Sequence, residues 1–72
     1  MKIIYDREVD AISIFFTETT VTTKELDEGI FLDYDQHGRL AGIEILDASK
    51  RVGGKDALRQ VILEGIGLKV PA

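Results

Sequence analysis

Apolar and polar residues alternate on both sides of a short polar segment within residues 29–49. An alternation with a period of two indicates β-strands, and the His37-Gly38 pair between them favours a two-residue hairpin turn. Because the side chains of a strand alternate between its faces, the position of this turn fixes which residues are opposed. It predicts two opposed pairs, Ile30 with Ile45 and Leu32 with Ile43.

Both faces of this predicted hairpin are partly apolar. One face carries Ile30, Leu32, Tyr34, Ala41, Ile43 and Ile45, and the other carries Phe31, Asp33, Asp35, Leu40, Glu44 and Leu46. An antiparallel sheet commonly packs one face on the core and exposes a polar one. A second face with large apolar residues needs a cover, and the chain has material for only one. The candidate interface residues are therefore Phe31, Leu40 and Leu46 of this second face, together with Phe15 from a strand upstream.

Three segments upstream complete the predicted sheet. Residues 3–5 and 11–16 are short β-branched and aromatic runs separated by a charged stretch, which is typical of a hairpin. In the second run Ile12, Ile14 and Phe16 would point to the core, and Phe15 to the other face. Residues 19–23 are rich in threonine, whose stiff side chain suits a strand. We expect an antiparallel meander of about five strands over residues 1–46.

The pattern changes after Leu46. Residues 47–51 favour a helical turn, and Gly53-Gly54 ends it. Apolar residues then recur at helical spacing, which predicts a C-terminal helix over residues 55–65. This helix would pack on the face of Ile12, Ile14, Ile30, Leu32, Ile43 and Ile45. The expected fold is a single α+β domain over residues 1–72, a small β-meander with one C-terminal α-helix on one face.

A chain of this size has little stability to spare as a monomer. For 72 residues, folding buries roughly 7,000 Å². If about 60% of that area is apolar, its burial at ~25 cal/mol per Å² stabilises the fold by about 105 kcal/mol. Ordering the chain at ~1.5 kcal/mol per residue costs about 108 kcal/mol. The chain has no cysteine for a disulfide, so oligomerisation is the remaining way to stabilise it. We expect a homodimer with Phe15 and Phe31 at its centre.

The charge of the chain argues against nucleic acid as its partner. Thirteen acidic residues and nine basic ones give a net charge of −4. The basic residues are scattered, with the densest group at Lys50, Arg51, Lys55 and Arg59, whereas phosphate backbones are bound by clustered lysine and arginine. No apolar run is long enough for a signal peptide or a membrane span. We expect a cytoplasmic protein that binds neither membranes nor, by itself, nucleic acid.

One spacing resembles a calcium loop. Asp33, Asp35, Gly38 and Glu44 stand at positions one, three, six and twelve of an EF-hand loop, with His37 at the fifth. The flanking residues are strand-like rather than helical, so we reject this interpretation. The same carboxylates more simply solubilise the strand face around Phe31.

No set of nucleophile, base and orienting residue can be assembled from the sequence. Ser13 and Ser49 lack a nucleophile motif, and His37 is the single histidine. We expect no catalytic, cofactor-binding or metal residues and no cofactor. A distant alternative is a metal-dependent enzyme that uses Asp33, Asp35 and Glu44.

Several motifs resemble the bacterial domain-of-unknown-function 2283 family. They lie within residues 1–50, and the most specific of them is the run Gly-Ile-Glu-Ile-Leu-Asp-Ala-Ser at residues 42–49. The others are Tyr5-Asp6-x-Glu8-x-Asp10-Ala11, Asp27-Glu28-Gly29-Ile30 and Asp33-Tyr34-Asp35-x-x-Gly38-Arg39-Leu40. The chain departs from the family pattern at Arg7, where proline is common, and at Phe15, where a polar residue is usual.

The resemblance implies a small protein without established catalytic or ligand residues. Some members of this family resemble the antitoxin-like halves of two-gene modules. We therefore expect a non-catalytic protein–protein interaction module, an antitoxin-like partner of a neighbouring gene product. The alternative is a structural homodimer whose partner is a second copy of itself.

Overall fold

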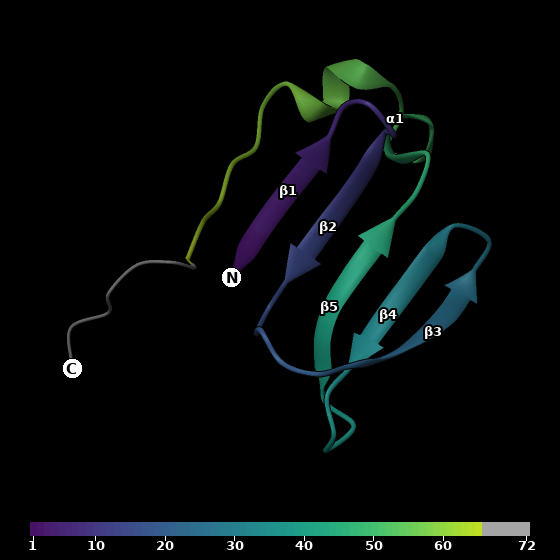
Figure 1. The fold of residues 1–72 in the computed structure, drawn as a ribbon. Helices are drawn as coiled ribbons and strands as arrows, with labels where there is room; N and C mark the ends of the chain where they lie inside the picture. The colour runs from purple at the N-terminus through teal and green to yellow at the C-terminus, as the bar shows by residue number, and fades with distance from the viewer. Residues whose placement is uncertain (66–72) are drawn as a thin grey trace.

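The computed structural model of the chain describes residues 1–65 and shows one antiparallel sheet followed by short helical turns (Figure 1). The strands are β1 (Lys2–Asp6), β2 (Ala11–Phe15), β3 (Thr22–Asp27), β4 (Ile30–Tyr34) and β5 (Leu40–Ile45). They are followed by α1 (Ala48–Arg51) and the 3-10 helix η1 (Lys55–Leu58). The predicted antiparallel sheet of five strands with helical residues after it is confirmed, although the helical content is small.

The order of the strands in the sheet is β1-β2-β5-β4-β3, which differs from the predicted continuous meander. The first two strands form one hairpin and the last three form a meander, but β5 rather than β3 lies beside β2. The pairing of Ile12 with Ile45 and of Ile14 with Ile43 joins the two parts. This order places the apolar strands in the middle. The threonine-rich β3, in which every residue is exposed, becomes an edge.

The hairpin of β4 and β5 has the predicted register over most of its length. Ile30 lies opposite Ile45 and Leu32 opposite Ile43. Near the turn the register shifts, because Asp33 lies opposite Gly42 but Tyr34 lies opposite Leu40, which leaves Ala41 as an extra residue.

The register shift moves Leu40 to a different face from the one we predicted. Leu40 lies opposite Tyr34 and therefore on the face of Leu32, not with Phe31. The cause is a turn wider than two residues. The Asp35 N–H donates to the Arg39 carbonyl at 2.8 Å, and Gly38 closes the turn with a φ of 78°.

Side-chain burial in this sheet is shallow. Among residues 1–65 the buried apolar side chains are the alanines Ala11, Ala41 and Ala48, and no large side chain is fully buried. Every residue of β4 is half-buried, as are the four residues of β2 after Ala11. A single-layered sheet gains little from burial on either face. The described part of the chain therefore leaves apolar surface for contacts with other molecules.

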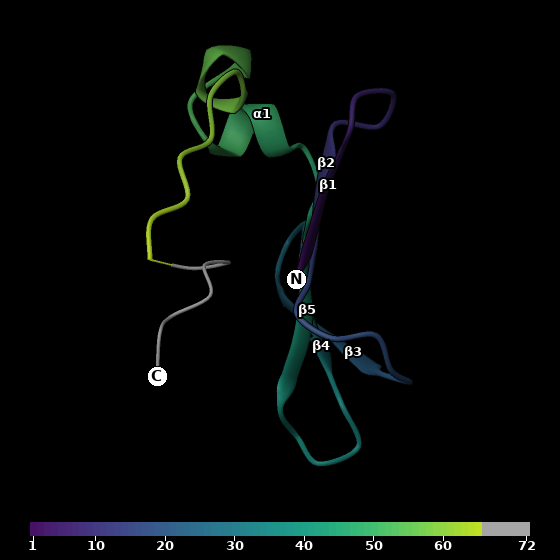
Figure 2. The same cartoon turned by 90° about the vertical axis from the view of Figure 1, so that its left-hand side faces the viewer.

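The helical residues cover one end of one face, and the predicted helix over residues 55–65 is wrong. In Figure 2, α1 and η1 lie on one side of the sheet near the β1–β2 turn. Leu58 of η1 and Tyr5 line the same cleft, and Tyr5 pairs with Ile12, so this is the face predicted for the helix. Only Lys55–Leu58 is helical, and Val61, Ile62 and Leu63 are 59–69% exposed. Without packing, so short a helix does not form.

No helix within residues 1–65 has the length and apolar character needed to cross a membrane.

Candidate functional site

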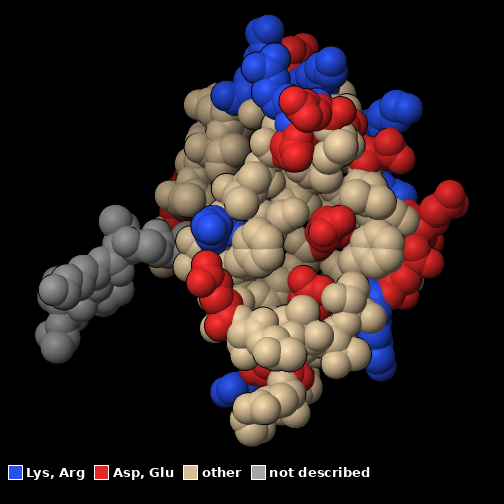
Figure 3. All heavy atoms as spheres, in the orientation of Figure 1, with Lys and Arg blue, Asp and Glu red and all other residues tan. Residues whose placement is uncertain are grey.

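The face of the sheet turned away from α1 gathers most of the predicted interface residues, and we call it the open face. Strand pairing places Phe15 beside Gly42 and Asp33, and Phe31 beside Glu44 and Ser13. Ile4 of β1 extends the same face at one edge. The open face comprises Lys2, Ile4, Ser13, Phe15, Thr23, Glu25, Phe31, Asp33, Glu44 and Leu46. Figure 3 looks onto it and shows mostly uncharged side chains in its middle, with acidic groups among them.

Three of the four predicted interface residues share this face. Phe15, Phe31 and Leu46 are half-buried, and Leu46 continues the alternation one residue beyond β5. Leu40 is 40% exposed and lies on the opposite face because of the register shift. The structure therefore brings together Phe15, Phe31 and Leu46 and separates Leu40 from them.

The connection between β2 and β3 crosses one end of the open face. Phe16 and Thr17 donate their N–H groups to the Ala41 carbonyl at 2.8 and 3.3 Å, which ties the start of this connection to β5. A shallow cleft of about 290 Å³ lies there, lined by Phe15, Thr17, Thr19, Val21, Asp33 and Ala41. The connection passes on the side away from α1 (Figure 2). It covers the end near Phe15 and leaves Phe31 without a cover from the described residues.

The charges on the open face are mostly negative. Phe31 has an acidic residue directly opposite on each neighbouring strand, Glu25 on β3 and Glu44 on β5. Asp33 accepts a hydrogen bond from Thr23 Oγ1 at 2.5 Å. A contact surface of this kind suits a partner that combines apolar side chains with lysine or arginine.

A second cluster, which sequence reasoning missed, ties α1 to the β1–β2 turn. The Asp10 carboxylate accepts hydrogen bonds from the Tyr5 hydroxyl at 2.6 Å and from the Ser49 hydroxyl at 2.7 Å. It also accepts the Ser49 N–H at 3.1 Å, while the Asp10 carbonyl accepts the Ala48 N–H at 2.8 Å. We call these three residues, Tyr5, Asp10 and Ser49, the Asp10 clamp.

The Asp10 clamp replaces the usual helix cap. Asp47 precedes α1 but makes no side-chain capping bond, so the N-terminal N–H groups of α1 need another acceptor. Asp10 supplies it from 39 residues away, and a carboxylate is also favoured at the positive end of the helix dipole. Asp10 itself has a φ of 54°, a left-handed conformation that aspartate tolerates better than most residues. The clamp is a structural device that sets the position of α1.

Two carboxyl groups of the fold are held in their charged form. Hydrogen bonds from Tyr5 and Ser49 lower the pKa of Asp10. The pKa of Asp35 is lowered by the backbone N–H of Arg39 above all, and further by the backbone of His37 and the Arg39 side chain. The Arg39 Nε lies 2.9 Å from Asp35 Oδ2. Asp35 is thus occupied in stabilising the β4–β5 turn.

These shifts predict that acid destabilises the fold. Because both pKa values are lower in the folded chain than in the unfolded one, the two carboxylates stabilise the fold above a pH of about 4. This stabilisation is lost as the pH falls through their folded-state pKa values. We expect the midpoint of urea unfolding to be lower at pH 3 than at pH 7 by on the order of 1 M. The double variant Asp10→Asn/Asp35→Asn should show a clearly smaller difference, and an unchanged one would contradict this account.

The enzyme alternative would use Asp33, Asp35 and Glu44, but these three carboxylates do not lie together. Asp35 lies in the turn with Arg39, Asp33 bonds Thr23, and Glu44 is exposed beside Phe31. Within residues 1–65 no group of three or more histidine, cysteine or acidic side chains is placed to hold a metal ion. Residues 33–44, whose calcium-loop spacing we rejected, include the end of β4 and most of β5 and have no helix on either side.

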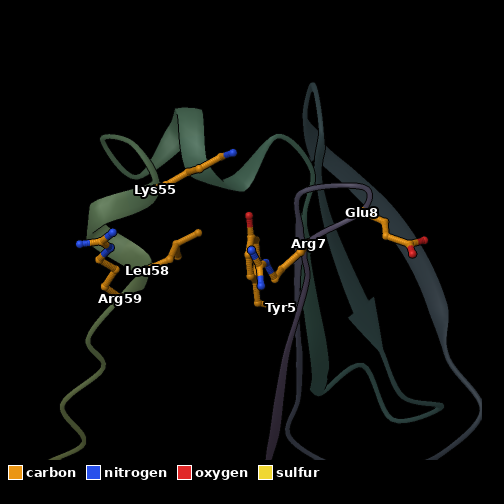
Figure 4. Close-up of a pocket in the computed structure, with 6 residues that line it drawn as sticks. All are labelled: Tyr5, Arg7, Glu8, Lys55, Leu58 and Arg59. Carbon is orange, nitrogen blue, oxygen red and sulfur yellow. The ribbon is translucent and has the colours of Figure 1, made fainter.

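A cleft with a volume of about 510 Å³ lies between β1 and η1. Figure 4 shows Tyr5, Arg7, Lys55, Leu58 and Arg59 around it, while Glu8 points away. The Tyr5 hydroxyl donates to Asp10, and its pKa is raised mainly by that bond. Arg59 pairs with Asp56 at 3.4 Å. Arg51, another member of the basic group noted in the sequence, donates to the carbonyls of Leu46 and Glu28.

Comparison with known proteins places this architecture in a family. The model of the family described as "Protein of unknown function (DUF2283)" matches residues 2–49, two thirds of the chain. The chain belongs to the DUF2283 family. The match contains the whole sheet and all three residues of the Asp10 clamp, and it ends before η1. The resemblance inferred from the sequence is confirmed.

A relative of this DUF2283 protein is the uncharacterized protein MJ0789 of Methanocaldococcus jannaschii, which is 39% identical over 71 residues. The alignment covers 93% of this chain but 60% of the relative, so the chain spans less than two thirds of the length of the curated relative it matches. This relative is archaeal, so proteins similar to this chain are not confined to bacteria. No solved structure matches the chain.

The motif residues of the family resemblance have structural tasks in this chain. Tyr5, Asp10 and Ser49 form the Asp10 clamp, and Asp35 with Arg39 shapes the hairpin turn. Gly42 lies where a Cβ atom would come within 2.8 Å of the Ile14 carbonyl, so a side chain there would push β5 away from β2. These residues specify the sheet. The open face, with Phe15 and Phe31, is the surface of the described chain that is available for contacts with other molecules.

Proposed function

We propose that this DUF2283 protein is a non-catalytic protein-interaction module that binds a basic protein through its open face. The observation that carries the proposal is the exposure of the sheet. Phe15, Phe31 and Leu46 are half-buried on a face that no helix within residues 1–65 covers. Large apolar groups gathered on one side of a small sheet are typical of interaction surfaces.

The charge of the open face supports a basic partner. Glu25, Asp33 and Glu44 surround or interrupt its apolar residues, and the chain as a whole carries a net charge of −4. A second copy stacked face to face would bring these acidic groups against one another. Burying like charges without partners is costly. A partner with lysine or arginine around an apolar centre would instead be complementary.

The resemblance of some family members to antitoxin-like halves of two-gene modules suggests where such a partner is encoded. The proposed partner is the small, basic product of an adjacent gene. An antitoxin-like protein needs a binding surface and no catalytic residues, which agrees with the structural tasks found for the motif residues.

The test is co-expression of the chain, tagged at its C-terminus, with the products of the flanking genes. We expect one basic product to copurify in a defined stoichiometry, because the open face supplies both apolar contact and opposite charge. Raising the salt concentration from 0.1 to 0.5 M should weaken the complex, since screening reduces attraction between the two surfaces. If no flanking product binds, or if the binding protein is acidic, the proposal is wrong.

A further inference from the structure

We propose that the free edge of β1 pairs with β1 of a second copy, so that two five-stranded sheets join into one sheet of ten strands. This inference concerns an edge of the sheet rather than the open face, and it stands independently of the proposed partner. It assigns the expected homodimer to a different surface from the one suggested by the sequence.

The edge at β1 lacks two of the features that commonly protect edge strands, a bulge and a proline. β1 pairs with β2 on one side, and no strand of the described chain lies on its other side. Its register against β2 has no bulge, and it contains no proline. Ile3 and Ile4 are 48% and 44% exposed, and they lie on opposite faces of the strand. A flat, apolar edge strand offers its unpaired backbone groups to another strand.

The other edge of the sheet is protected. β3 has a register shift between Glu25 and Asp27, where Leu26 is the extra residue. Such a bulge twists the strand and interrupts the row of backbone groups that a new strand would bind. Every residue of β3 is exposed, and most of them are polar or charged. The two edges therefore differ in a way that favours β1 as the site of pairing.

The sequence of β1 is complementary to itself in antiparallel pairing. A two-fold axis through Ile4 places Lys2 of one copy opposite Asp6 of the other, at both ends of the paired segment. The same register places Ile3 opposite Tyr5 and Ile4 opposite its own copy. Opposed pairs of opposite charge and of apolar side chains stabilise adjacent strands. Shifting the register by two residues would remove both charge pairs, so the central register is favoured.

Lys2 is available for such a contact. Its side chain is 60% exposed, and its ion pair within the chain is a long one, 3.9 Å to Glu18. Asp6 accepts the Glu8 N–H with one carboxylate oxygen at 2.9 Å, which leaves the other oxygen available for a lysine. The paired segment is only five residues long. We therefore expect a weak dimer, with a dissociation constant on the order of 10 µM.

The experiment measures the mass of the full chain, tagged at the C-terminus, by sedimentation equilibrium between 1 and 200 µM. The wild type should pass from monomer to dimer over this range. Lys2→Glu and Asp6→Lys should each weaken the dimer by at least about tenfold, because each places like charges opposite one another. The double variant Lys2→Glu/Asp6→Lys restores opposite charges at both ends and should dimerise like the wild type. Circular dichroism of each variant verifies that it is folded.

The rescue by the double variant and a separate control make the result decisive. Phe31→Arg changes the open face and should leave this dimer unchanged, so failure of the partner proposal does not imply failure here. The inference is overturned if the single variants dimerise normally, if the double variant does not recover, or if Phe31→Arg abolishes the dimer. A monomer at every concentration would also overturn it.

Discussion

Phe31→Arg should weaken binding of the basic partner about 100-fold while the chain stays folded. Phe31 supplies apolar contact area near the middle of the open face, and an arginine would meet the positive charge of the partner there. The folded chain can accept this change because Glu25 and Glu44 lie opposite position 31 on the two neighbouring strands. Cross-strand pairs of opposite charge stabilise a sheet. The substitution therefore separates binding from folding.

Isothermal titration calorimetry with the purified partner measures the loss, and thermal unfolding verifies the fold. Thr22→Arg is the matched control, since it adds the same charge on the edge strand β3 but lies opposite Tyr34 on the other face. The control should bind like the wild type. Equal affinities for the wild type and Phe31→Arg would show that the open face is not the binding surface.

Asp10→Ala should lower the melting temperature by about 15 °C, the largest stability effect that we expect from a single exposed or part-buried residue. The substitution leaves the Ser49 N–H, the Ser49 hydroxyl and the Tyr5 hydroxyl without their common acceptor. It also places alanine at a φ of 54°, where a Cβ atom is unfavourable. Differential scanning calorimetry gives the change directly.

Two conservative variants separate the causes of this loss. Asp10→Asn keeps a residue that tolerates the left-handed conformation but removes the charge and one acceptor, so we expect about half of the effect. Tyr5→Phe removes one donor and keeps the ring, so its effect should be smaller still. If Asp10→Asn were as stable as the wild type, neither the charge of Asp10 nor its second acceptor oxygen would contribute to stability.

Local patterns in the sequence predicted the local parts of this fold. The alternation around His37-Gly38 was enough to predict the pairing of Leu32 with Ile43, because hairpin register depends on residues close together in the chain. It could not predict the extra residue Ala41, and one extra residue reverses the face of every position beyond it. Leu40 was therefore assigned to the wrong face, while Phe15 and Phe31 were assigned to the same face as each other, which the pairing supports.

The long-range parts could not be predicted in the same way. Turn signals favour pairing between consecutive strands, so they gave no reason to place β5 rather than β3 beside β2. The apolar spacing after residue 55 is compatible with a helix, but a helix of that length needs a surface to pack on, and Val61 to Leu63 are exposed. Asp10 and Ser49 are 39 residues apart. Their common presence in the family motifs was the available signal.

The Asp10 clamp also has a consequence for the order of folding. Both hairpins consist of residues before position 46, and their contacts join segments that are close in sequence. The acceptor that caps α1 takes its position only when the β1–β2 turn has formed, so α1 cannot be nucleated by its own four residues. On a ribosome, a nascent chain that has emerged as far as Leu46 contains every strand but lacks the donors from Ser49. We therefore expect the sheet to form first and α1 to be the last of these elements to become stable.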